Sequence, residues 1–216
     1  MKHLKNILTA ATLIAAASSA SAIQFDLVAY SFNPGSGYSE GTNALTEVLG
    51  NLNKLGVDFS VDGTARSFDL TEGSTSASFK FGDITLQDGS LAPWITGTWP
   101  VDETNNLDLS ATFWFTNPLG VGYQTVTALG TATIGRIGDS AIDFSIDWAD
   151  EVVTFGNGGE FHIHMDDISF TANGQMKDQT YSIELVTAPI PEPETYALML
   201  AGLGLVGFMA RRRKQA

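Results

Sequence analysis

Residues 107–115 read LDLSATFWF, and every second residue of this stretch is apolar. A period of two places successive side chains on opposite faces of an extended chain, which is typical of a half-buried antiparallel strand. The stretch therefore predicts a strand that lines a core with Leu107, Leu109, Ala111, Phe113 and Phe115.

The same alternation recurs at residues 57–61, 77–81, 142–148, 161–165 and 181–185. Residue pairs that favour turns, such as Asp62-Gly63 and Asn117-Pro118, separate these runs. Many short strands at this spacing predict a mainly β fold, an antiparallel β-sandwich that is jelly-roll-like. Only residues 43–54 repeat their apolar side chains at helical spacing, which predicts one short helix. A strand with a turn through Gly50-Asn51 is the alternative there.

The N-terminus has the three regions of a secretory leader. Lys2 and Lys5 supply positive charge, residues 7–17 are apolar, and Ala20-Ser21-Ala22 is an A-x-A cleavage pattern. We expect residues 1–22 to form a helical signal peptide. It enters the secretion translocon and is then removed by signal peptidase. The mature chain then starts at Ile23.

The C-terminus carries a second apolar stretch. Residues 196–210 read YALMLAGLGLVGFMA, and Arg211, Arg212, Arg213 and Lys214 follow directly. As a helix, this run of about 15 residues rises about 22 Å, which is less than the roughly 30 Å hydrocarbon core of a bilayer. It spans only if the bilayer thins or the flanking residues snorkel. We expect a transmembrane helix at 196–210 and a basic cytoplasmic tail at 211–216.

A proline-rich linker at residues 189–195 precedes this helix and contains Pro191-Glu192-Pro193. Prolines remove backbone donors and hold the chain extended, in a form that a processing enzyme can grip. The order of Pro-Glu-Pro, short apolar helix and basic end resembles the PEP-CTERM sorting signal, with Glu194 where serine is common. The resemblance implies an exported protein of a Gram-negative bacterium, processed near Pro-Glu-Pro by the membrane enzyme exosortase. It also implies an association with exopolysaccharide or biofilm.

Between the two ends, residues 23–188 form one predicted domain. The chain has 11 basic and 24 acidic residues, of which this region keeps 5 and 22, so its net charge is −17. A surface this acidic makes nucleic-acid binding improbable, because the phosphate backbone requires a basic partner. The chain has no cysteine, so the exported domain relies on its core without disulfides.

Two histidines give the strongest metal-like pattern. His162 and His164 alternate with the apolar residues of their strand, which places both on one face, together with Asp166. Two imidazoles and a carboxylate are a ligand set for zinc or a similar ion, and a polar outer strand face is the alternative. For three acidic clusters, calcium binding is one hypothesis, and solvent-exposed loops without a ligand are the simpler one. These clusters are Asp102-Glu103, Asp147 with Asp150-Glu151, and Asp166-Asp167.

Three functions compete for the mature domain. We expect no enzymatic activity and no obligatory cofactor, and a role as a surface or extracellular-matrix protein that starts as an inner-membrane-anchored precursor. The first alternative is a carbohydrate-binding module, with or without calcium, that stacks sugars on tryptophans. Trp148 continues a core face, Trp114 lies on an outer face, and Trp94 and Trp99 flank residues 95–98 in an expected loop. The second is a metal-dependent hydrolase in which His162 and His164 converge with a carboxylate, or a serine hydrolase in which Ser140 reaches one of these histidines.

Overall fold

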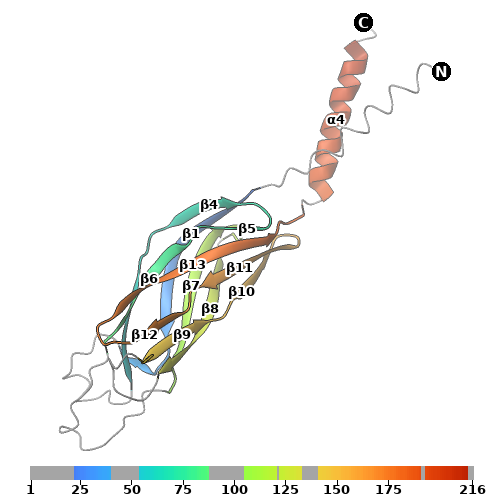
Figure 1. The fold of residues 1–216 in the computed structure, drawn as a ribbon. Helices are drawn as coiled ribbons and strands as arrows, with labels where there is room; N and C mark the ends of the chain where they lie inside the picture. Colours follow the sequence, from blue (N-terminus) through green and yellow to red (C-terminus); the bar gives the residue numbers. More distant parts are fainter. Residues whose placement is uncertain are drawn as a thin grey trace, which may run out of the picture.

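The structure is a computed structural model, and it describes residues 22–39, 54–87, 105–120, 122–132, 141–190 and 193–213. Apart from Ala22 and Lys54, the predicted leader and the predicted helix at 43–54 lie outside these ranges. The described chain forms two sheets and a C-terminal helix (Figure 1).

The first sheet has six antiparallel strands. Their order is β12 (Ile168–Phe170), β9 (Phe144–Trp148), β8 (Gly122–Ala132), β7 (Asp108–Asn117), β1 (Ile23–Pro34) and β4 (Arg66–Leu70). The strand predicted from residues 107–115 is thus β7, at the centre of this sheet between β8 and β1.

The second sheet has seven strands, and only its edge pair of β2 and β3 is parallel. Along the sheet lie β10 (Glu151–Phe155), β11 (Gly159–Met165), β13 (Met176–Thr187), β6 (Phe79–Leu86), β3 (Leu55–Val61) and β2 (Tyr38–Ser39). The short β5 (Ser74–Thr75) also pairs with β13. The prediction of a mainly β fold is confirmed, and the finer jelly-roll-like assignment stays a prediction.

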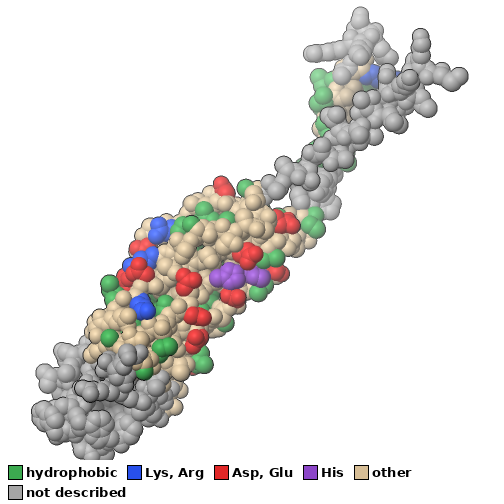
Figure 2. All heavy atoms as spheres, viewed as in Figure 1, with side chains coloured by type: hydrophobic (Ala, Val, Ile, Leu, Met, Phe, Trp, Pro, Cys, Tyr) green, Lys and Arg blue, Asp and Glu red, His purple; other side chains and the backbone are tan. Residues whose placement is uncertain are grey.

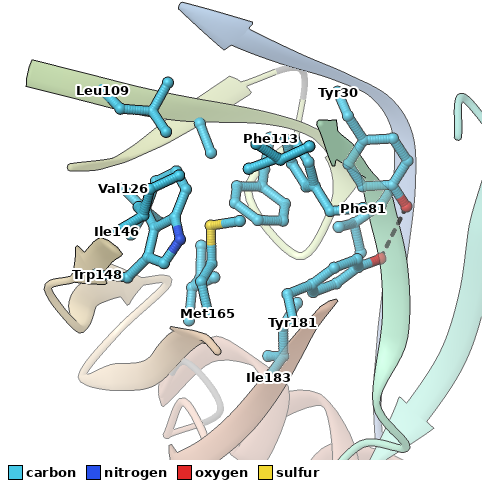
Figure 3. Close-up of a cluster of buried hydrophobic side chains, with 14 of the residues drawn as sticks. Tyr30, Phe81, Leu109, Phe113, Val126, Ile146, Trp148, Met165, Tyr181 and Ile183 are labelled. Atoms are coloured by element: carbon cyan, nitrogen blue, oxygen red, sulfur yellow. Dashed lines mark hydrogen bonds between the residues drawn. The ribbon is translucent and has the colours of Figure 1, made fainter. Parts of the chain in front are cut away.

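The two sheets pack on each other through aromatic side chains. Phe113 of β7 is fully buried, and its ring centroid lies 5.0 Å from that of Phe81 on β6 and 5.1 Å from that of Tyr181 on β13. Tyr30 of β1 contributes a further ring 5.9 Å from Phe113 (Figure 3). Offset and edge-to-face aromatic pairs add to the free energy that burial of their area supplies. This cluster joins the sheets at the centre of the molecule.

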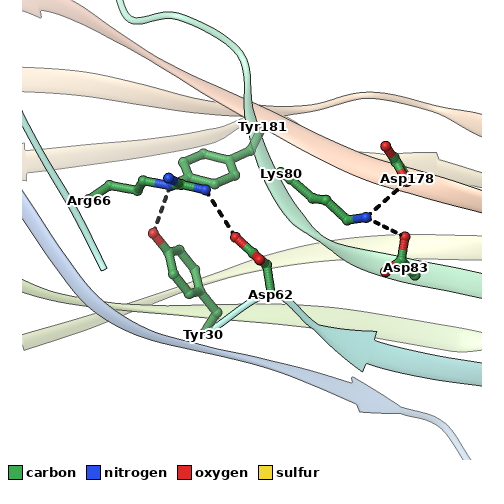
Figure 4. A network of polar contacts seen from close by, with 7 residues as sticks. All are labelled: Tyr30, Asp62, Arg66, Lys80, Asp83, Asp178 and Tyr181. Carbon is green, nitrogen blue, oxygen red and sulfur yellow. Dashed lines mark hydrogen bonds and ion pairs between the residues drawn. The ribbon is translucent and has the colours of Figure 1, made fainter. Parts of the chain in front are cut away.

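A polar network lies beside this aromatic cluster (Figure 4). The hydroxyl oxygens of Tyr30 and Tyr181 are 2.8 Å apart in the interior. Burial is the main cause that raises the pKa of each phenol above its usual value, so both stay protonated. Nearby, Lys80 Nζ lies 2.6 Å from Asp83 and 3.0 Å from Asp178. The hydrogen bonds to these two carboxylates raise the pKa of the Lys80 ammonium group.

Simple alternation fails at two bulges. In β1, Leu27 and Tyr30 are both buried, and the register shifts between Leu27 and Ala29. In β6, Phe81 and Ile84 are both buried, and the pairing with β13 shifts beside Gly82. A bulge inserts one extra residue, so the inward face changes phase along the strand. A period of two with constant phase therefore does not describe either strand along its full length.

Strand ends also depart from the predicted pattern. Val61 and Ile142 are 39% and 53% exposed, although the alternation assigns them to the core face. Val61 is the last residue of β3, and Ile142 precedes β9, so neither lies in the central part of a strand. The central apolar positions of β7, β11 and β13 are buried as predicted.

Candidate functional site

His162 and His164 lie on the outer face of the seven-stranded sheet, two residues apart on β11. Their neighbours Phe161, Ile163 and Met165 point into the core. The two imidazole rings are half-buried, and their centroids are 5.9 Å apart. Carboxylates gather around them, as the purple histidines among red side chains show in Figure 2. Strand alternation is thus the cause that brings both imidazoles to one surface, as the sequence predicts.

Glu184 supplies the carboxylate nearest to both histidines. It is the partner of His162 across the β11–β13 ladder. Its Oε2 lies 3.4 Å from Nε2 of His164. One ligand-type atom from each of His162, His164 and Glu184 lies within 4.8 Å of the others. Directly paired residues of antiparallel strands have Cβ atoms about 5 Å apart, which explains the proximity.

Two further carboxylates orient the imidazoles. Asp150, in the turn before β10, places Oδ1 2.7 Å from Nδ1 of His164. Glu160, two residues before His162 on the same strand face, places Oε1 3.2 Å from Nε2 of His162. Each histidine therefore contacts a carboxylate of its own.

Asp166 does not join this cluster. Its Oδ2 accepts a hydrogen bond from the hydroxyl group of Thr180 on β13. The sequence pattern placed Asp166 on the histidine face as a third ligand, and the structure brings Glu184 there instead. The reason is that Asp166 follows the end of β11 and lies beside Thr180, four residues before Glu184 on β13.

The acidic clusters proposed for calcium do not converge in the part of the chain that the structure describes. Asp167 accepts a hydrogen bond from the backbone N–H of Trp148 at 2.7 Å, while Asp150 contacts His164. Asp147 faces Ser145 on its own strand. Calcium requires six to eight oxygen ligands around one point, and these carboxylates point to different partners.

The outer face of the six-stranded sheet carries two aromatic side chains side by side. Trp114 of β7 is directly opposite Tyr123 of β8, and on its other side it pairs with Ala29 of β1. Tyr123 is 66% exposed, and Trp114 is half-buried. The predicted outer position of Trp114 is thus what the structure shows. Trp148 is buried, and its indole N–H donates to Gln179 at 3.0 Å.

Small polar side chains continue this face from the aromatic pair. The next row pairs Ser31, Thr112 and Thr125, and the hydroxyl of Thr112 also accepts a hydrogen bond of 3.0 Å from Asn33. Sequence reasoning predicted the outer position of Trp114 but missed Tyr123. The two side chains become neighbours only through the β7–β8 register, which the sequence pattern does not give.

Several predicted positions fall outside the described ranges. They are Trp94, Trp99, Asp102, Glu103 and Ser140, so the structure does not test the loop tryptophans or the serine hydrolase hypothesis.

The tail leaves the sandwich after β13 and stays attached for three more residues. The backbone N–H of Ala188 donates to Glu72 at 3.3 Å, and that of Ile190 donates to the carbonyl oxygen of Asn157 at 2.9 Å. Pro191 and Glu192 lie outside the described ranges. The predicted linker therefore begins with residues that are hydrogen-bonded to the domain, and its Pro-Glu-Pro follows directly after them.

Helix α4 (Pro193–Arg213) begins at the last proline of Pro191-Glu192-Pro193 and includes Arg211, Arg212 and Arg213. It is longer than the helix predicted at residues 196–210. Among the residues that the structure describes, no helix has both the length and the apolar character needed to cross a membrane. This finding does not support the predicted transmembrane helix, whose apolar run is about 15 residues where a spanning helix needs about 20.

Comparison with protein-family models matches residues 189–214, which include Lys214, to the PEP-CTERM protein-sorting motif. The tail is a PEP-CTERM motif. No curated protein and no solved structure matches the chain. The resemblance stated from the sequence is thereby confirmed for the tail, and the β-domain is assigned to no family.

The PEP-CTERM motif implies an exported protein that exosortase sorts to the cell surface. The match begins at Pro189, two residues after β13 ends at Thr187. The sorting signal and the folded domain therefore adjoin each other, and Ile190 of the matched segment is hydrogen-bonded to Asn157 of the domain.

Proposed function

We propose that the β-domain is a non-enzymatic component of the cell envelope or the extracellular matrix, delivered there by exosortase and associated with exopolysaccharide. The PEP-CTERM match at residues 189–214 carries this proposal. Signal peptidase and the secretion translocon act before exosortase in the proposed order, because the A-x-A pattern of Ala20 to Ala22 is N-terminal.

The positions of the two domain ends support processing by both enzymes at one end of the domain. Ile23, at the start of β1, pairs with Leu70, the last residue of β4. The turn that follows β4 contacts the end of β13: Gly73 N–H donates to the carbonyl oxygen of Leu185 at 2.7 Å. The start of β1 and the end of β13 therefore lie at the same end of the domain (Figure 1), and the two predicted cleavage sites adjoin them in sequence. Both enzymes can act at that end while the rest of the domain points away from it.

Replacement of Glu192 by alanine is expected to abolish C-terminal processing, because this carboxylate is the only charged group in Pro191-Glu192-Pro193. The measurement is the intact mass of the protein from a host that has its exosortase. Wild-type protein should start at Ile23 and lack the residues beyond the Pro-Glu-Pro region, and the variant should keep the full tail. The matched control is Glu194→Ser, which changes a carboxylate two residues away and should leave processing unchanged.

A host without exosortase completes this test. The wild-type tail should persist there in full. Loss of the tail in that host, or equal processing of the Glu192 variant and wild type, would contradict exosortase sorting of this chain.

The aromatic face of the six-stranded sheet favours a second candidate function, carbohydrate binding. Trp114 and Tyr123 are adjacent across the ladder and offer ring faces on which a sugar can stack. Ser31 and Thr125, in the row beside them, are half-buried and supply hydroxyl groups that donate and accept hydrogen bonds. With a net charge of −17 on residues 23–188, the domain favours neutral polysaccharides over anionic ones.

Tyr123→Ala is expected to weaken binding to the host's own exopolysaccharide about fivefold or more, because truncation of an aromatic hot spot costs more than about 1 kcal/mol. Affinity electrophoresis in gels that contain the polysaccharide measures this change. Leu129→Ala is the matched control, since Leu129 is also exposed on β8, at 60%, but is not aromatic. Unaltered mobility of the wild-type protein in the polysaccharide gel would exclude this candidate.

A further inference from the structure

We propose that His162, His164 and Glu184 form a binding site for a late first-row divalent metal ion, such as zinc, on the outer face of the seven-stranded sheet. The site goes beyond the sorting function, because it lies on strands β11 and β13 of the domain and uses no residue of the PEP-CTERM tail.

The first argument is the spacing of the ligand atoms. One donor atom from each of the three residues lies within 4.8 Å of the other two. Zinc holds its ligands at about 2.0–2.2 Å, which places neighbouring donors about 3.3 Å apart. The separation of 3.4 Å between His164 Nε2 and Glu184 Oε2 already has this value. Small rotations of His162 then complete a three-ligand set.

The second argument is the environment of His164. Both of its ring nitrogens face carboxylate oxygens: Nδ1 faces Asp150 at 2.7 Å, and Nε2 faces Glu184 at 3.4 Å. A neutral imidazole has one N–H donor, so one of these contacts then sets a lone pair against an anion. A metal ion between Nε2 and Glu184 removes that repulsion. A doubly protonated imidazolium also removes it, and the experiment below distinguishes the two.

The third argument concerns orientation and charge. Asp150 holds Nδ1 of His164 in the way that carboxylates hold metal-bound histidines, which fixes the ring and directs Nε2 toward the metal. Glu160 stands in a similar position beside His162. With neutral imidazoles, the carboxylates of Asp150, Glu160 and Glu184 give the cluster a negative charge that attracts a cation.

The ligand types select the metal. Imidazole suits zinc, copper and nickel, whereas magnesium and calcium prefer oxygen ligands in larger number. The side chains of His162, His164 and Glu184 are 27%, 32% and 40% exposed, so solvent can supply the remaining ligand. Copper(II) should bind more tightly than zinc, following the general order of affinities for such sites.

Titration of the full chain with zinc chloride against a chromophoric chelator tests the site. Wild-type protein should bind one equivalent of zinc, and magnesium and calcium should not compete. His164→Gln should weaken binding about 100-fold or more, and Glu184→Gln about tenfold or more. Asp150→Asn, which alters only the carboxylate that orients His164, should cost roughly 10- to 100-fold.

Asp166→Asn is the matched control, because Asp166 is a carboxylate next to β11 whose partner is Thr180. Its zinc affinity should stay within about twofold of wild type. No zinc binding would overturn the proposal. Equal weakening of zinc binding by Glu184→Gln and by Asp166→Asn would also overturn it. Thermal unfolding of each variant without metal checks that it is folded.

Discussion

Phe113→Ala is expected to lower the free energy of unfolding by about 3–5 kcal/mol, the cost typical of truncating a large buried aromatic side chain. Phe113 is fully buried on β7, and its ring contacts Phe81 and Tyr181 of the opposite sheet at centroid distances of 5.0 and 5.1 Å. Truncation removes the apolar area of the ring and leaves a cavity that two rigid sheets cannot close. Urea unfolding followed by tryptophan fluorescence measures the change.

Leu129→Ala is the matched control for this experiment. Leu129 is in β8, the strand beside β7, but its side chain is 60% exposed, so its loss should cost less than about 0.5 kcal/mol. A Phe113→Ala cost as small as that of the control would mean that the ring does not join the two sheets in solution.

Gly82→Ala is expected to destabilise the domain by about 3 kcal/mol, although it adds only one methyl group. Gly82 is buried in β6, where the pairing with β13 has its bulge. A Cβ atom there would collide with the carbonyl oxygen of Ser60 on β3 and lie 3.0 Å from Cα of Val61. Both contacts are with backbone, which cannot rotate away. The β3–β6 ladder must therefore separate locally.

Gly122→Ala provides the control, again in a strand. A Cβ atom at Gly122 meets the Cβ of Leu119 at 3.6 Å, an ordinary contact distance. We expect its unfolding free energy to change by less than about 0.5 kcal/mol. If urea unfolding shows equal stabilities for the two alanine variants, β6 does not pass as close to β3 as the structure has it.

The sequence predicted the strands best where one face is buried over their central length. In β7 and β11 the inward residues alternate without interruption, so a period of two is sufficient to predict which side chains enter the core. Alternation is not constant along β1 and β6, because a bulge changes the phase and depends on how a neighbouring strand pairs. Gly82 is a sequence signal of such a position, since glycine inside a strand often marks a bulge or a close backbone approach.

For the candidate metal site as well, the sequence predicted the residues that lie on one strand but not their partner on the neighbouring strand. Alternation within one strand is a local property, and it was sufficient to predict that His162 and His164 share a face. Glu184 is 22 positions after His162 along the chain, and it becomes a neighbour only through the register of β11 with β13. Asp166, near in sequence, pairs with Thr180 instead.

By itself, the sequence determined the PEP-CTERM tail, because order and spacing of Pro-Glu-Pro, apolar run and basic end are linear properties. It also determined the mainly β class, since each predicted strand shows apolar residues with a period of two in its own sequence. Only the tertiary structure decided which strands are neighbours, where the bulges lie, and that Trp114 stands beside Tyr123 and His162 beside Glu184. The physical reason is that alternation assigns a side chain to a face, whereas its partner on that face depends on strand order and register, which are set by packing of the whole core.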